Sequence, residues 1–512
     1  MVRYQNPIAK GMCPDPSVVR VGDTFYMVNS TFEYFPGIRL AKSKDLIHWQ
    51  DLPSVIQTKN QADLSQAHSN EGIFAVCIRY HQGYFYVITT NFAEWKNFII
   101  RGRLDESQQQ IIWEDSRVVI DIMGIDPDLF FEDEQVYVQF TGFTKNGQKA
   151  IQQVQIEIET GEILRGPEIL SFGTGGRDVE GPHIIKHHGQ YYLLMAEGGT
   201  GAGHMITMQK SEHLWGPYHA ALEVNPLFTN RDRAEEPLQN IGHADLFQDE
   251  KENWWMVCLG TRPFTHEHIQ FTNLGRETLL YPVLWEEEWP TIYQGVPTLE
   301  VDLADFPQHQ ALIQEAHPVA EAFVETFSSG QVAPQWLSLR ASLAERMTVT
   351  NHQLLLKGSE VTLSQTSSPS FLALRQTEHQ QELTVEINPA MCQIKDGAIG
   401  VACCIDTQHY AAIMIKQTSD GFVAYRIQKV LDIEIEEAIA QLTTIPQKFG
   451  ISHRPTEKEF YLEDERQGRI SFTTSAIHFS NEAVCALNTG DMQGIYCLGE
   501  NAQISVTKVT VQ

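Results

Sequence analysis

The alternation of apolar and polar positions in the first 300 residues follows one pattern five times. Each copy has a short polar or small-residue start, two or three apolar positions, a turn, and an aromatic-rich run that alternates as a β-strand does. The copies start at Asp15, Phe74, Asp126, Glu180 and His243. A repeat of about 50 to 60 residues built from β-hairpins is typical of four-stranded propeller blades. The pattern therefore predicts a five-bladed β-propeller.

The repeat ends near residue 300, and a different β pattern follows. Residues 306–322 indicate a connector with weak helical character. From Phe323 onward, short strand-like runs such as GAIGVACCI and ISVTKVTV, with a turn at Asp420-Gly421, favour a β-sandwich. We predict an all-β chain with a propeller over residues 1–305, a connector over 306–322 and a sandwich over 323–512.

Composition narrows the classes of function. The hydrophobic fraction of 42% and the charged fraction of 20% are those of a globular protein. With a net charge of −28, the chain lacks the basic surface that binding to nucleic acid or to an anionic membrane requires, so we expect neither as a partner. The N-terminus has no apolar segment of signal-peptide length, and the eight cysteines form no C-x-x-C pair. Free thiols in a reducing compartment, and hence a cytoplasmic location, are the expectation.

The starts of the repeats carry the candidate chemistry. In a propeller the innermost strands line one axis, so Asp15, Asp126, Glu180 and His243 are expected to converge at one mouth. Clustered carboxylates repel one another and need a functional reason. Two carboxylates flanking a glycosidic bond are the usual apparatus of glycoside hydrolysis, and a third nearby raises the pKa of the acid. The sequence therefore favours a glycosidase.

A series of motifs in chain order resembles glycoside hydrolase family 43, which contains β-xylosidases and α-L-arabinofuranosidases. The motifs are CPDPSVV at 13–19, STFEYFPG at 30–37, GIDPDLFF at 124–131, VEGPHIIK at 179–186, AEGGTG at 196–201, GHADL at 242–246 and LGRET at 274–278. The second domain resembles the concanavalin-like β-sandwich of the family's xylosidase branch. The resemblance implies an inverting, exo-acting hydrolase that removes terminal xylose or arabinofuranose from small oligosaccharides, requires no cofactor and forms a homo-oligomer.

The family's roles transfer onto matching positions. Asp15 resembles the general base, Glu180 the general acid, and Asp126 the residue that tunes and orients the acid. The walls of the subsite for the terminal sugar are matched by Phe32, Phe74, Ala75, Thr200, His243 and Arg276. In parts of the family the histidine at position 243 helps to hold a calcium ion through water in the central channel. A neutral histidine hydrogen-bonded in the core is the alternative.

Several alternatives stay open at this point. Asp128 is a rival to Asp126 for the tuning role. Glu197 is a rival to Glu180 for the role of the acid, but it is better interpreted as a residue that supports the acid. Asp178 is interpreted as a loop residue. Phe74 stands where many xylosidases have tryptophan, so the sequence does not distinguish xylose from arabinofuranose. The loop near Asp491-Met492 is expected to close one side of the pocket. A carbohydrate-binding propeller without catalysis is the main alternative function, and a retaining or phosphorolytic propeller enzyme is another.

Overall fold

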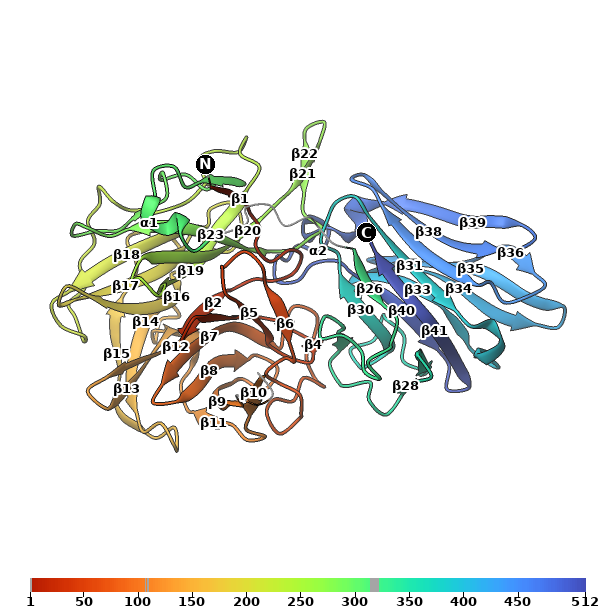
Figure 1. The fold of residues 1–512 in the computed structure, drawn as a ribbon, viewed down its shortest axis with the longest axis horizontal. Helices are drawn as coiled ribbons and strands as arrows, with labels where there is room; N and C mark the ends of the chain where they lie inside the picture. Colours follow the sequence, from red (N-terminus) through yellow and green to blue (C-terminus); the bar gives the residue numbers. More distant parts are fainter. Residues whose placement is uncertain (1, 106, 108–109, 314–321) are drawn as a thin grey trace.

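The computed structural model describes residues 2–105, 107, 110–313 and 322–512. Two β-rich bodies lie side by side along the long axis of the molecule (Figure 1). In the described residues the helices are short: α1 (Pro307–Gln310), α2 (Asn481–Val484) and the 3₁₀ turns η1 (Pro389–Met391) and η2 (Ala476–Phe479). The predicted all-β class is confirmed. Among these described helices, none has the length and apolar character needed to cross a membrane.

Five antiparallel sheets follow one another along the first body. Their strands are β2 (Ser17–Val21), β3 (Thr24–Asn29), β5 (Arg39–Ser43) and β6 (Gln50–Leu52); β7 (Ile73–His81), β8 (Tyr84–Asn91), β9 (Lys96–Asp105), β10 (Gln110–Trp113) and β11 (Val118–Ile120); β12 (Gly124–Glu132), β13 (Gln135–Phe143), β14 (Lys149–Ile156) and β15 (Ile163–Ser171); β16 (Glu180–His187), β17 (Gln190–Glu197) and β18 (Met205–Ser211); and β19 (Gln239–Gln248), β20 (Trp254–Thr261), β23 (Glu277–Leu284) and β24 (Thr291–Ile292). A small hairpin, β21 (Phe264–His266) with β22 (Ile269–Phe271), extends from the last sheet.

The five sheets surround one axis. The first strand of each sheet contacts the first strand of the next, in the order β2, β7, β12, β16 and β19, and β19 contacts β2 to complete the ring. Apolar side chains pack between neighbouring sheets, as where Phe25 meets Phe247 edge to face at 5.9 Å between ring centroids. β1 (Arg3–Gln5) pairs with β25 (Glu300–Asp302), which ties the start of the chain to the end of this body. The predicted propeller architecture is confirmed.

The second body is a sandwich of two antiparallel sheets. The first contains β28 (Met347–Thr350), β29 (Gln353–Lys357), β41 (Ala502–Val511), β31 (Gln381–Ile387), β37 (Lys448–His453), β38 (Glu457–Asp464) and β39 (Gly468–Ser475), with β26 (Phe323–Glu325) and β32 (Gln393–Ile394) also on β41. The second contains β30 (Ser370–Arg375), β40 (Met492–Leu498), β33 (Ala398–Asp406), β34 (His409–Thr418), β35 (Gly421–Val430) and β36 (Ile433–Leu442). Strands such as β31 alternate buried and half-buried positions, as a sheet with one face on a core requires.

The two bodies are joined by backbone pairing as well as by the chain. β4 (Tyr34–Phe35) of the propeller pairs with β27 (Ser338–Leu339) of the second body. Arg340, almost fully buried, donates from Nε to the carbonyl of Ala67 and from Nη1 to that of Ser367. β25 ends at Asp302 and β26 begins at Phe323, and residues 314–321 of the predicted connector lie outside the described residues.

Candidate active site

Three carboxylates from different inner strands share one end of the propeller axis. Asp15 lies just before β2, Asp126 lies in β12 and Glu180 begins β16. The negative charges of Glu180 and Asp15 both act on Asp126, and Nδ1 of His243 in β19 lies 3.8 Å from Oδ1 of Asp15. The structure therefore brings together the residues that start the first, third, fourth and fifth repeats.

Local irregularities in the inner strands aim these side chains. The pairing register shifts between Ile125 and Asp128 in β12, and similar shifts follow Glu180 in β16 and Gly242 in β19. Asp15, Asp126 and His243 all have positive φ, at 50°, 53° and 47°. Bulges of this kind re-aim side chains beside active sites, and left-handed backbone at non-glycine residues is strained. Simple strand alternation does not predict this arrangement.

Asp15 is arranged to stay ionised. Its carboxylate is 3% exposed, and it accepts a 2.6 Å hydrogen bond from Ser30 Oγ and a 3.2 Å hydrogen bond from Arg276 Nη1. Burial by itself would raise the pKa of Asp15, but Arg276, His243 and Ser30 outweigh it and lower that pKa below its ordinary value. An ionised carboxylate at this position has the charge state that a general base needs.

Asp126 is arranged in the opposite sense. Burial raises its pKa well above the ordinary value, and the negative charges of Glu180 and Asp15 raise it further. Lys149 and Arg276 oppose this shift without cancelling it. The site therefore contains neighbouring carboxylates whose surroundings move their protonation apart, which is the usual sign of an acid and base division of labour.

Glu180 faces a lysine that the sequence analysis did not single out. Lys149, at the start of β14, donates from Nζ to Oε2 of Glu180 at 3.0 Å and lies 3.7 Å from Oδ1 of Asp178. The side chains of Lys149 and Glu180 are 25% and 14% exposed, so the pair lies at the mouth of the site. Asp178 also pairs with the exposed Arg177, in agreement with its interpretation as a loop residue. No motif marks Lys149, because its importance comes only from this contact.

Aromatic rings and one arginine form a wall beside Asp15. The rings of Phe32 and Phe74 lie 5.7 Å apart, and Phe74 stacks on Phe92 at 4.7 Å. The guanidinium of Arg276 lies 5.6 Å above the Phe32 ring and donates to Thr200 Oγ1 at 3.2 Å. Such a wall offers apolar faces and a fork of donors to a sugar.

The remaining sequence candidates support the site from behind. Ala75 is buried, and its carbonyl accepts a hydrogen bond from Thr89 Oγ1. Glu197 is fully buried, and both its oxygens are occupied, by the backbone N–H groups of Thr174 and Gly176 and by Thr207 Oγ1. It therefore holds the loop before Glu180.

A second histidine that the sequence analysis missed lies beside these groups. His204 is buried, and its ring leaves no space for a Cβ on Gly242. Burial lowers the pKa of His204 to about 4, so its ring stays neutral. Its position in the GAGH segment carries no recognisable signal.

The sandwich supplies another wall. A cleft of about 540 Å³ lies between the two bodies, lined on the propeller side by Thr200 and Asn240 and on the sandwich side by Leu487 and Asn488, among others. The carbonyl of Asn488 accepts a 3.5 Å hydrogen bond from Arg276 Nη2. Asp491 instead is buried inside the sandwich, where it pairs with Lys458 at 2.5 Å. The residues just before Asp491, not Asp491 itself, therefore line the cleft.

Comparison with known proteins decides the family. The model of glycosyl hydrolases family 43 matches residues 4–290, and that of the β-xylosidase C-terminal concanavalin A-like domain matches residues 324–509. The chain belongs to glycosyl hydrolase family 43. It is 31% identical, over 97% of its length and 91% of the relative, to the non-reducing end α-L-arabinofuranosidase BoGH43B of Bacteroides ovatus. It is 35% identical, over 74% of its length and 73% of the relative, to a xylosidase/arabinosidase of Butyrivibrio fibrisolvens.

Solved family 43 structures extend the similarity over both bodies. The structure named Bacteroides ovatus xyloglucan PUL GH43B superposes with a TM-score of 0.88 at 29% identity, covering 100% of this chain and 99% of that one. Xylan β-1,4-xylosidase from Bacillus halodurans superposes with a TM-score of 0.87 at 26% identity, covering 99% and 100%. The resemblance drawn from the motifs and the concanavalin-like second domain are confirmed, and this family 43 protein is a glycoside hydrolase.

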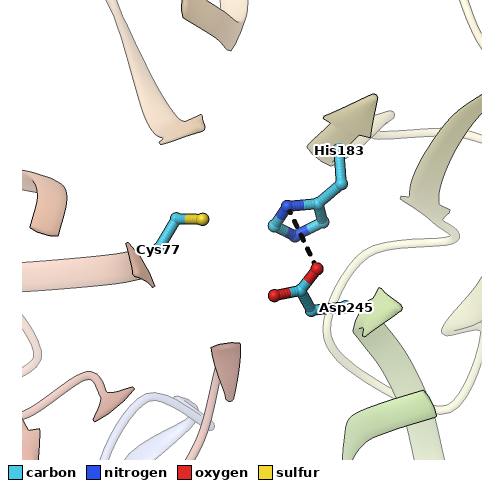
Figure 2. A group of neighbouring side chains, drawn as sticks. All are labelled: Cys77, His183 and Asp245. Carbon is cyan, nitrogen blue, oxygen red and sulfur yellow. Dashed lines mark ion pairs between the residues drawn. The ribbon is translucent and has the colours of Figure 1, made fainter. Parts of the chain in front are cut away.

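The axial channel of this family 43 chain does not fit the calcium ion that the resemblance implied. Cys77, His183 and Asp245 point toward one another from three inner strands, a donor set that by itself could hold a metal (Figure 2). However, the guanidinium of Arg79 donates to Oδ2 of Asp245 at 2.9 Å and to Oδ2 of Asp128 at 2.8 Å. A divalent cation there would lie against a fixed positive charge.

The surroundings of Asp128 and His243 bear on the alternatives that the sequence left open for these two residues. Asp128 is a partner of Arg79, which with His183 lowers the pKa of Asp128 to about 2 despite its burial. It therefore does not act as a rival to Asp126. The pKa of His243 is lowered, chiefly by burial, which agrees with the neutral core histidine.

Proposed function

We propose that this glycoside hydrolase is inverting and exo-acting, and that it releases a terminal xylose or arabinofuranose from short oligosaccharides. The observation that carries the proposal is the convergence of Asp15, Asp126 and Glu180 at one end of the axis, where Asp15 and Asp126 have opposite surroundings. Asp15 has a lowered pKa beside Arg276, whereas Asp126 has a raised pKa beside Glu180. Relatives named as xylosidases and arabinofuranosidases support the sugar class.

In the proposed reaction a water molecule attacks the anomeric carbon from the side of Asp15. Asp15 takes the proton of that water as the new C–O bond forms. The glycosidic C–O bond breaks on the other face, and Glu180 transfers its proton to the departing oxygen. A direct displacement of this kind inverts the anomeric centre and requires the two carboxyls to be about 6.5–9.5 Å apart.

The surrounding residues have separate roles in this proposal. Asp126 is proposed to tune and orient the acid, because the negative charges of Asp126 and Glu180 lie close enough to act on each other. Phe32 and Phe74 hold the faces of the terminal sugar, and Arg276 binds its hydroxyls while keeping Asp15 ionised. Ala75, Thr200 and His243 complete the pocket.

Proton NMR and a set of variants test the proposal together. We expect the first sugar released to have the opposite anomeric configuration to the substrate. Asp15→Asn should lower kcat/KM on xylobiose and on a dinitrophenyl xyloside alike, because both need an activated water. Glu180→Gln should damage xylobiose far more, since a dinitrophenolate leaves without protonation.

Asp126→Asn should resemble Glu180→Gln more weakly and move the alkaline limb of the pH–rate profile to lower pH. Asp133→Asn, an exposed change in the turn at the far end of β12, is the control. Retention of configuration, or identical behaviour of Asp126→Asn and Asp15→Asn, would contradict the proposed roles.

The alternative of a non-catalytic carbohydrate-binding protein predicts sugar binding without release of either aryl pentoside. Exo action predicts that monosaccharide is released before the viscosity of polymeric xylan or arabinan falls. A cytoplasmic location, which the eight free cysteines support, is also a proposal, as is a homo-oligomer. Cell fractionation and light scattering measure these two properties.

A further inference from the structure

Directly along the axis from the carboxylates, one arginine contacts all the other inner strands. Arg79 in β7 donates to Ser17 in β2 at 3.2 Å, to Asp128 in β12 and to Asp245 in β19, and its Nη2 lies 3.1 Å from Nδ1 of His183 in β16. These four partners lie two or three residues along their strands from Asp15, Asp126, His243 and Glu180, respectively. Arg79 and these four partners therefore form a layer next to the layer of candidate catalytic residues along the axis.

The charges of this layer need a cation. Asp128 and Asp245 are each 1% exposed, and two ionised carboxylates so buried would be strongly destabilising without a positive partner. Arg79 supplies one charge and enough donors to reach both of them, with two contacts to Asp245 at 2.9 and 3.2 Å. Ser17 adds a 2.6 Å hydrogen bond to Asp245, and His183 lies 2.9 Å from Asp128.

The side chains that surround Arg79 are also ones that could bind a divalent metal as ligands. Two carboxylates, the imidazole of His183 and the thiol of Cys77 face one region of the channel, and Cys77 donates to Asp128 at 2.6 Å. Figure 2 shows Cys77, His183 and Asp245 converging there from different strands. Carboxylate, imidazole and sulfur ligands together suit Zn²⁺, and the carboxylates suit Ca²⁺ and Mn²⁺.

We infer that Arg79 is a cation built into the chain that takes the place of a channel metal, linking the five inner strands beneath the catalytic carboxylates. The fold is then independent of divalent metal, and removal of Arg79 exposes a site that a divalent cation occupies. This inference depends on the geometry of the channel and not on the proposed sugar specificity.

Thermal unfolding and isothermal titration test the inference without using activity. Wild type should keep the same Tm in EDTA and in Ca²⁺, Mn²⁺ or Zn²⁺. Arg79→Ala should lower the Tm by about 5–10 °C, because two buried carboxylates lose their partner. At least one of the three cations should then bind with a stoichiometry of one per chain and restore most of the lost Tm. Arg103→Ala, an exposed arginine on β9, is the control and should change neither property.

Two further variants keep the test decisive. Arg79→Lys retains the charge, so its Tm should lie between those of wild type and Arg79→Ala and should not respond to metal. If Arg79→Ala does not fold, the triple variant Arg79→Ala/Asp128→Asn/Asp245→Asn removes the unpaired charges and should fold without binding metal. The inference fails if EDTA lowers the wild-type Tm, if Arg79→Ala has the wild-type Tm or ignores all three cations, or if the triple variant does not fold.

Discussion

At the scale of single residues, the candidate acid has two charged neighbours with opposite effects. Lys149 donates to Glu180 at 3.0 Å and opposes the rise in the pKa of Asp126, whereas Asp126 and Glu180 carry charge of the same sign. In the proposed mechanism Glu180 must be protonated when the substrate is bound, so both neighbours are expected to affect the alkaline limb of the pH–rate profile. Asp126→Asn and Lys149→Met should therefore move this limb in opposite directions.

Lys149→Met should shift the alkaline limb of the pH–rate profile upward, since it removes the cation that lies 3.0 Å from Glu180. The shift is modest because Lys149 is partly exposed and solvent screens it. The measurement is kcat/KM on xylobiose across pH. Lys186→Met, at the opposite end of β16 where the lysine pairs with Glu132, is the matched control. A downward shift in Lys149→Met would show that Lys149 does not stabilise the ionised acid.

At the scale of elements, bulges at the starts of the inner strands place the candidate catalytic groups. Gly181 follows Glu180 with φ of +58°, and a Cβ there would come within 3.0–3.1 Å of the His243 ring. The fourth inner strand therefore needs a glycine for its backbone conformation and for its close approach to the fifth.

Gly181→Ala should lower kcat/KM about 100-fold, because a displaced Glu180 no longer reaches the leaving oxygen. The control is Gly189→Ala in the turn between β16 and β17, where φ is +76° and no atom lies within 4 Å of the added Cβ. Each variant places an alanine in the left-handed backbone region, which costs about 1–2 kcal/mol. The difference in activity between the two variants therefore reports the crowding of the added Cβ at the site. Thermal unfolding and kinetics measure both, and equal activities would contradict the argument.

At the scale of the whole molecule, the two bodies meet at a buried titratable group. Glu33 is 1% exposed beside β4, accepts a hydrogen bond from the backbone N–H of Asn70 and lies near Arg340 of the second body. Burial raises the pKa of Glu33 from 4.5 to about 7, and Arg340 opposes the shift only in part. The folded state therefore binds this proton more tightly than the unfolded state.

The stability contributed by protonated Glu33 is complete below about pH 4.5 and is lost as the pH rises through about 7. Glu33→Gln keeps the shape of the side chain and removes its titration. The Tm of wild type minus the Tm of Glu33→Gln should therefore decrease as the pH rises from 5 to 8. Glu223→Gln, in an exposed loop, should follow wild type. A difference in Tm that does not change with pH would exclude Glu33 as its source.

The sequence alone determined the all-β class, the family and the three candidate carboxylates. A repeat makes equivalent positions visible, so Asp15, Asp126 and Glu180 stand out as departures from the pattern at the starts of strands. Strand alternation and turn residues are local properties, and for that reason they are readable without a structure.

Only the tertiary structure decided which charges meet. Lys149 joins Glu180, and Arg79 joins Asp128 and Asp245 across the channel, between residues 31 to 166 positions apart in the chain. The bulges that aim the side chains also depend on pairing with neighbouring strands, and they break the period of two on which sequence interpretation relies. Charge pairing and burial depend on distances in space, which composition and spacing along the chain do not contain.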